Sequence, residues 1–188
     1  MGRKARLSDD QLQAVANQIK VPLSHLKAVA EVESRGFGFL PDGRPKILFE
    51  GHKFHKFTKG KFSRTNPVVS HRGWTRKYYR MDQYARLEEA VALDREAALM
   101  SASWGKFQVM GFNWKVCKYP SLQKFINDMF RSELGHLRSF VGFITTNKLI
   151  GPLREGDFDR FALRYNGKGY KLNKYARKMR ALELKFRR

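Results

Sequence analysis

A glutamate at the end of an apolar helical run is the residue best suited to acid–base chemistry. The run AVAEVESRG spans residues 28–36, and Glu33 lies four residues after Val29 and seven after Leu26. It therefore shares their inward stripe, whereas Glu31 points away. Burial and the negative end of the helix dipole disfavour the carboxylate, so we expect a raised pKa and general-acid capacity. The alternative is a structural ion pair between Glu33 and an arginine.

Metal and thiol chemistry have less support in the sequence. His52 and His55 have a spacing that can bind a metal ion, but no cysteine or pair of acids accompanies them. We interpret them as surface or packing histidines and expect no metal and no cofactor. The lone Cys117 cannot form an internal disulfide, and MGRKARLSDD lacks the apolar stretch of a signal peptide, so we expect synthesis in a reducing cytosol.

Two predicted helices position the candidate acid. The first runs from about Ser8 to Lys20, because Ser8 and Gln11 have the spacing of a capping box. The second starts near Pro22, which suits a first turn, and stops near Gly36. The candidate acid thus lies at the mouth of a helix.

The remaining elements follow from caps and apolar periodicity. Residues 37–80 have no sustained periodicity and predict an irregular lobe, with a short hairpin around the turn at residues 41–43. Residues 101–105 predict a break between helices. Helices are predicted after the caps Asp82, Asp94 and Asp157, and from Tyr175 to Phe186.

The most apolar helical pattern begins at Ser121 and continues to Ile144, so we expect one long central helix there. Glu133 lies between apolar positions of this pattern and is expected to pair with an arginine in the interior. The fold class predicted is mainly α, with a central long helix and a small irregular or β lobe.

Length and charge limit the classes of protein to which this chain can belong. A chain of 188 residues with 42% hydrophobic residues fits one domain spanning residues 1–188, and we expect a monomer. The net charge of +21 implies a polyanionic partner, which charge alone does not identify. Nine Lys and Arg residues against the single Glu183 make residues 168–188 a basic amphipathic segment, either a solvated helix or a contact for anionic outer-membrane or cell-wall polymers.

Three short motifs occur in a recognisable order: VES at residues 32–34, SWGKFQVMG at 103–111 and RYNG at 164–167. Together they resemble the site of the lysozyme superfamily, including goose-type lysozymes and lytic transglycosylases. GFLPDGRPKILFE at 38–50, followed by His52, makes the chain more similar to the phage endolysin N-acetylmuramidases. The resemblance covers residues 26–175. It departs from the family at Arg35 and Gly51, where relatives often carry a small residue and an arginine.

This resemblance implies a lysozyme-like fold and hydrolysis of the β-1,4 bond between N-acetylmuramic acid and N-acetylglucosamine in peptidoglycan, with Glu33 as proton donor. Glycoside cleavage also employs a second carboxylate, either a base or a nucleophile. Glu50 is one candidate, because a charge in the apolar ILFE context is hard to explain as a surface residue. Asp42 is the other, although its Pro-Asp-Gly context also explains it as a turn residue.

The other motif residues are candidate substrate-binding groups. The resemblance implies that Gln108 reaches into the cleft, against the alternative of a satisfied loop amide. Tyr165 fits either the core or the cleft, and Asn166 follows an apolar helix immediately before a glycine, which would hold it at the cleft rim. Trp104 either stacks on a sugar or packs internally.

Two alternative functions are compatible with parts of this sequence. A lytic transglycosylase would use one glutamate and release 1,6-anhydro products. A non-enzymatic nucleic-acid-binding protein would account for the charge but not for an inward Glu33, so no specific nucleic acid is expected. As an endolysin the chain would be made in the host cytoplasm without a signal peptide, act in the periplasm or cell wall, and need no separate cell-wall-binding module.

Overall fold

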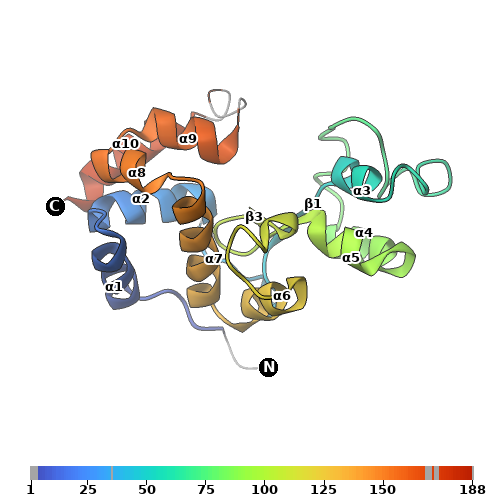
Figure 1. Ribbon diagram of the computed structural model, residues 1–188, viewed down its shortest axis with the longest axis horizontal. Coiled ribbons are helices and arrows are strands. Elements are labelled where there is room, and N and C mark those ends of the chain that lie inside the picture. The colour runs from blue at the N-terminus through green and yellow to red at the C-terminus, as the bar shows by residue number, and fades with distance from the viewer. Residues whose placement is uncertain (1–3, 35, 168–170, 172–173, 188) are drawn as a thin grey trace.

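The computed structural model describes residues 4–34, 36–167, 171 and 174–187, and it is mainly helical (Figure 1). Its helices lie on both sides of a small sheet. In chain order the elements are α1 (Asp9–Ile19), α2 (Leu23–Ser34), β1 (Ile47–Phe49), α3 (Gly51–Phe57), α4 (Gln83–Leu93), α5 (Arg95–Met100), β2 (Ala102–Trp104), β3 (Val109–Met110), the 3₁₀ helix η1 (Gly111–Asn113), α6 (Leu122–Arg131), α7 (Glu133–Thr146), α8 (Ile150–Glu155), α9 (Phe158–Asn166) and α10 (Tyr175–Phe186).

The helix caps predicted from the sequence are confirmed. Ser8 accepts a hydrogen bond from the Gln11 amide while its own amide donates to the Gln11 side chain, which is the expected capping box at the start of α1. Asp82, Asp94 and Asp157 cap α4, α5 and α9 with their carboxylates. These caps depend only on residues within one turn, which is why the sequence alone located them.

The sequence predicted a small irregular or β lobe but not the strands that form its sheet. β1, β2 and β3 form an antiparallel sheet in that order, with Ile47 opposite Trp104 and Ser103 opposite Met110. The segment 101–105, expected as a break between helices, thus supplies the central strand. Phe39 and Pro45 form a bridge around the turn at 41–43, as the expected hairpin requires. The strands have two or three residues, too few for a period to show in the sequence.

The expected single helix from Ser121 to Ile144 is wrong, because the chain turns at Ser132. Ser132 has extended backbone angles (φ −166°, ψ 163°), and its side chain accepts a hydrogen bond from the Gly135 amide, so it caps the start of α7. A Cβ on Gly135 would lie 2.3 Å from the carbonyl oxygen of Asp128, so only glycine permits this close turn between α6 and α7.

The core surrounds α7, which lies between α2 and α8–α10 on one side and the sheet on the other (Figure 1). Phe140 of α7 is fully buried, with its ring 4.6 Å from that of Phe107 and 6.4 Å from that of Phe161. The lobe of α3, α4 and α5 packs beyond the sheet. The site must therefore be assembled from segments that meet at the sheet from both sides.

The basic C-terminal segment is part of this core. In α10, Met179 is fully buried, and buried Glu183 lies 3.6 Å from His25 and accepts a hydrogen bond from Ser24 of α2. The opposite face exposes cations. Residues 168–170, 172–173 and 188 of the expected basic segment lie outside the described residues. No helix in the described part of the chain is long and apolar enough to cross a membrane.

Candidate active site

Two adjoining hollows form one groove between the lobes. The wider has a volume of about 790 Å³ and the narrower about 350 Å³. Both are lined by Glu33, Leu48, Gln108 and Tyr175, so the two hollows join at these residues. The candidate acid thus lies at the junction of the two arms of the groove, where a bond between two sugar units of a bound polymer could reach it.

Glu33 is half-buried near the end of α2, and burial raises its pKa to about 7. The Asn166 side-chain amide opposes this shift, because its Nδ2 donates a hydrogen bond of 3.1 Å to Glu33 Oε1. No ion pair within the described residues involves Glu33, so the arginine-paired alternative has no support there. Near neutral pH this carboxyl group can both hold and release a proton.

The Tyr-Asn-Gly motif supports the acid from the end of α9. Asn166 lies at the groove, as expected, but its amide contacts Glu33, so it orients the acid. Tyr165 combines the two roles that the sequence left open. Its ring stacks on Phe161 and its hydroxyl donates to the Phe107 carbonyl at 2.8 Å, yet it also lines the narrower hollow.

Gln108 lines both hollows, but the structure gives its amide internal partners. Its Oε1 accepts a hydrogen bond of 2.8 Å from the Ser103 hydroxyl, and its Nε2 donates to the Gly105 carbonyl at 2.9 Å. The backbone of Gln108 has φ 51°, in the left-handed region, which turns the side chain back toward this loop. Gln108 therefore braces the groove wall between β2 and β3.

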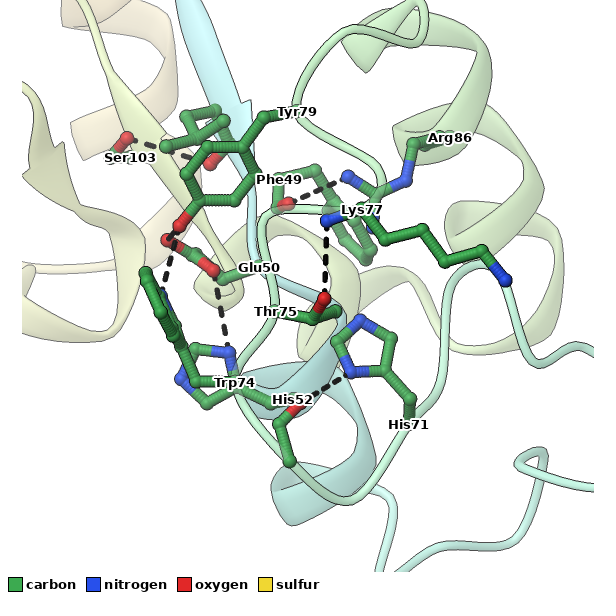
Figure 2. A network of polar contacts seen from close by, with 12 residues as sticks. Phe49, Glu50, His52, His71, Trp74, Thr75, Lys77, Tyr79, Arg86 and Ser103 are labelled. Atoms are coloured by element: carbon green, nitrogen blue, oxygen red, sulfur yellow. Dashed lines mark hydrogen bonds and ion pairs between the residues drawn. The ribbon is translucent and has the colours of Figure 1, made fainter.

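Glu50 shares the narrower hollow with Glu33 and is held by a chain of hydrogen bonds (Figure 2). The Trp74 indole donates to the Tyr79 hydroxyl at 3.0 Å, and that hydroxyl donates to Glu50 Oε1 at 2.9 Å. Because an indole N–H can only donate, the Tyr79 proton must point toward Glu50. The arrangement requires Glu50 Oε1 to accept, which favours the carboxylate form.

Burial raises the pKa of Glu50, while the Tyr79 hydrogen bond and the charges of Arg86 and Lys53 oppose the rise. His52 Nδ1 lies 3.3 Å from Glu50 Oε2, without the geometry of a hydrogen bond. Burial, followed by the charges of Lys53 and His71, lowers the pKa of His52. His52 is therefore neutral at neutral pH and adds little charge stabilisation to Glu50.

The chain matches a known protein family and a solved structure over most of its length. A family model described as N-acetylmuramidase matches residues 22–187. The chain belongs to the N-acetylmuramidase family. The crystal structure of an endolysin from the Burkholderia phage AP3 is similar, with a TM-score of 0.90 and 36% identity over 99% of this chain and 73% of that one. No curated protein matches by sequence. The expected resemblance to phage endolysin muramidases and the lysozyme-like, mainly α fold class are confirmed, and family membership makes the chain a peptidoglycan hydrolase.

Two candidate substrate-binding residues of this muramidase lie away from the groove. Trp104 is 1% exposed, and its indole donates to the Leu99 carbonyl at 3.1 Å, so of the two alternatives the structure shows packing. Asp42 lies on the exposed turn and accepts hydrogen bonds from the Arg44 amide and guanidinium, which lower its pKa. It lines neither hollow, and the turn satisfies it locally, which supports the turn-residue alternative.

The two histidines considered for metal binding have separate partners. His55 Nδ1 lies 2.6 Å from the Ser63 hydroxyl, while His52 faces Glu50 and His71. No group of three His, Cys, Asp or Glu side chains able to hold a metal occurs among the residues that the structure describes. At Gly51, where the resemblance implied an arginine in relatives, a Cβ would lie 2.5 Å from His71 Nε2 and 3.0 Å from the Val69 carbonyl oxygen, so a side chain here would require His71 to move. Arg35, the other departure, lies outside the described residues.

Glu133 is buried as expected, but the expected arginine partner is wrong. Its carboxylate accepts hydrogen bonds from the backbone amides of Leu7 at 2.8 Å and Gly38 at 2.5 Å, and it lies 3.7 Å from Lys106 Nζ. Lys106 Nζ also donates to the Gly36 carbonyl at 2.6 Å. This buried cluster ties the segment after α2 to the loop that carries Gln108.

Several groove-lining residues were not predicted as site residues from the sequence, among them Lys46, Arg76, Tyr79 and Tyr175. Tyr175 was predicted on the inward side of the last helix, but only the packing of α10 along α2 brings it beside Glu33. The other three belong to the segment 37–80, whose irregular sequence carries no periodicity. Its clustered aromatic and basic residues were the available signal.

Proposed function

We propose that this chain hydrolyses the β-1,4 bond between N-acetylmuramic acid and N-acetylglucosamine, with Glu33 as the general acid. The observation that carries the proposal is a carboxyl group with a pKa of about 7 at the junction of two arms of a groove. An alkoxide is a poor leaving group, so cleavage needs a proton on the glycosidic oxygen. Glu33 can supply that proton at neutral pH.

Glu50 is proposed as the second carboxylate. It lines the narrower hollow together with Glu33. Burial raises its pKa, while the Tyr79 hydrogen bond and nearby cations favour its charged form. A negative charge on this side of the bond would stabilise the oxocarbenium-like transition state. The carboxylate would act either as a base that takes a proton from the attacking water or as a nucleophile that attacks the anomeric carbon. The two carboxyl groups thus have different environments, which suits one to donate a proton and the other to carry charge.

In its biological role the chain is proposed to act as a phage endolysin that lyses the bacterial host. It would be made in the host cytoplasm and act on the wall as a monomer, with residues 1–188 as one catalytic domain. The exposed face of α10 carries Arg177, Lys178, Arg180, Lys185 and Arg187. We propose that this face adds electrostatic attraction to anionic outer-membrane or cell-wall polymers, which salt would weaken.

The test compares wild type, Glu33→Gln and Glu31→Gln in turbidity assays on cells stripped of their outer membrane. Glu31 is the matched control, because it is an exposed glutamate on the same helix. We expect Glu33→Gln to lose lysis by at least about a hundredfold and Glu31→Gln to retain it. Lysis by Glu33→Gln at the wild-type rate would overturn the assignment of the acid.

Product masses complete the test. Hydrolysis adds one water to each cleaved bond. In a transglycosylase the 6-hydroxyl of the muramic unit instead attacks its own anomeric carbon, the glycosidic bond breaks, the leaving sugar oxygen gains a proton, and a 1,6-anhydro end remains. We expect the hydrated product. Anhydro products alone would replace the hydrolase proposal by the transglycosylase alternative.

A further inference from the structure

The wider arm of the groove has an uncompensated positive charge. Its ionisable lining includes the cations Lys46 and Arg76 and the acids Glu33 and Asp82. The Asp82 carboxylate is engaged at the start of α4, where it accepts hydrogen bonds from the backbone amides of Tyr84 and Ala85. Glu33 is neutral while it holds its catalytic proton. In the described residues neither cation forms an ion pair, so the arm attracts an anion.

Lys46 projects from a rigid part of the groove wall, immediately before β1. Its backbone amide donates to the Gly38 carbonyl at 2.9 Å, and its carbonyl accepts a hydrogen bond of 2.8 Å from the Gly105 amide. The Gln108 side chain donates to the same carbonyl at 3.4 Å. The backbone of Lys46 is therefore hydrogen-bonded to segments on both sides and lies beside Gln108 at the junction of the groove.

Arg76 approaches from the other wall, on the segment that also carries Tyr79. Its guanidinium lies over the Trp74 indole, 5.4 Å from the ring centroid, while the indole N–H is bound to the Tyr79 hydroxyl. Cation–π packing holds the guanidinium plane without using its N–H groups. A planar guanidinium with available donors matches the two oxygens of a carboxylate.

We propose that Lys46 and Arg76 form a subsite for the carboxylates that peptidoglycan carries on its muramic acid units. This inference rests on the proposed function. N-acetylglucosamine is uncharged, whereas muramic acid carries a lactyl group whose carboxylate is either free or joined to a stem peptide with carboxylates of its own. The subsite orients the polymer in the groove and makes the enzyme favour peptidoglycan over the uncharged polymer chitin.

The experiment measures binding in the Glu33→Gln background, so that no turnover intervenes. Three soluble probes of equal length are compared: a chitin oligosaccharide without carboxylates, a peptide-free glycan strand with lactyl carboxylates, and a strand that keeps its stem peptides. Lys46→Met and Arg76→Met are the test variants. Lys77→Met and Arg80→Met are the matched controls, because both residues are exposed cations of the same segment that do not line the hollow.

We expect each test variant to weaken binding of a carboxylate-bearing probe about tenfold and to leave chitin binding unchanged. Loss only on the peptide-free strand assigns the free lactyl carboxylate, and loss only on the peptide-bearing strand assigns a carboxylate of the stem. Loss on both strands shows that the subsite accepts either carboxylate. Equal losses in test and control variants would show a general effect of surface charge, and equal losses on chitin would show an effect that does not depend on carboxylates. Either result would overturn the subsite.

The proposed function is tested independently by the products of the enzyme with Glu33 intact. If that enzyme cleaves peptidoglycan and the Lys46 and Arg76 variants bind all three probes like their parent, only the subsite fails. If the intact enzyme yields no cleaved glycan, the proposed function itself fails.

Discussion

Asn166 and Glu33 are 133 residues apart in the chain, and the amide of the first donates a 3.1 Å hydrogen bond to the carboxyl group of the second. The contact joins the ends of α9 and α2 at the junction of the groove. Burial and this hydrogen bond act in opposite directions on the pKa of Glu33, so their balance sets the pH at which the proton is released.

Replacing Asn166 by alanine should raise the pKa of Glu33 above about 7, because the lost hydrogen bond favours the charged form. We expect the alkaline limb of the pH profile of kcat/KM to move up by as much as about one unit. The measurement is hydrolysis of labelled peptidoglycan across the pH range. Asn127→Ala, at an exposed amide on α6, is the control, and an unmoved limb in Asn166→Ala would exclude the proposed coupling.

The raised pKa of Glu33 also predicts how stability depends on pH. The folded protein binds this proton up to about pH 7, whereas the unfolded chain releases it near the ordinary value of 4.5. The folded state therefore loses stability as pH rises from 4.5 to 7. Glu33→Gln should remove this loss, and its free energy of unfolding at pH 8 should exceed that of wild type by on the order of 2 kcal/mol.

Denaturant unfolding of both proteins at pH 4 and pH 8 provides the measurement. Their difference in unfolding free energy should be larger at pH 8. A difference that is the same at both values would mean that Glu33 titrates like a free glutamate, and the assignment of the acid would lose its physical basis.

Tyr79→Phe should shift the acidic limb of the activity profile to higher pH, because the hydroxyl that favours charged Glu50 is removed. We also expect kcat/KM near neutral pH to fall about tenfold. Tyr78→Phe is the control, since the neighbouring ring lies over Arg86 and its hydroxyl makes no hydrogen bond among those of the described residues. An unchanged acidic limb in Tyr79→Phe would argue against a role for charged Glu50.

Met179→Ala should show that α10 belongs to the folded core. Met179 is fully buried, so its truncation leaves a cavity and should cost about 2–5 kcal/mol of unfolding free energy. Leu184 on the same helix is 61% exposed, and Leu184→Ala should change stability by less than about 0.5 kcal/mol. Thermal or denaturant unfolding measures both, and similar stabilities for the two variants would mean that α10 is only loosely attached.

The sequence by itself determined several helix starts and the inward position of the acid. Ser8, Asp82, Asp94 and Asp157 cap helices through contacts within one turn, and the stripe of Leu26 and Val29 is buried as helical phase predicts. Glu33 follows that stripe, so its burial and raised pKa were predictable. Helix caps and helical phase depend on residues three or four positions away in the chain, so they can be recognised in the sequence alone.

Tertiary structure alone decided what surrounds the acid. Trp104 and Asn166 both belong to recognisable motifs, yet one lies in the core and the other binds Glu33. Packing of the lobes and helices also places the hydrogen-bonded chain of Trp74, Tyr79 and Glu50, and it brings Tyr175 to the groove. The strands between the lobes are too short to show a periodic pattern of apolar residues in the sequence. Contacts between distant segments are selected by the burial and hydrogen bonding of the whole fold, which no local pattern of residues specifies.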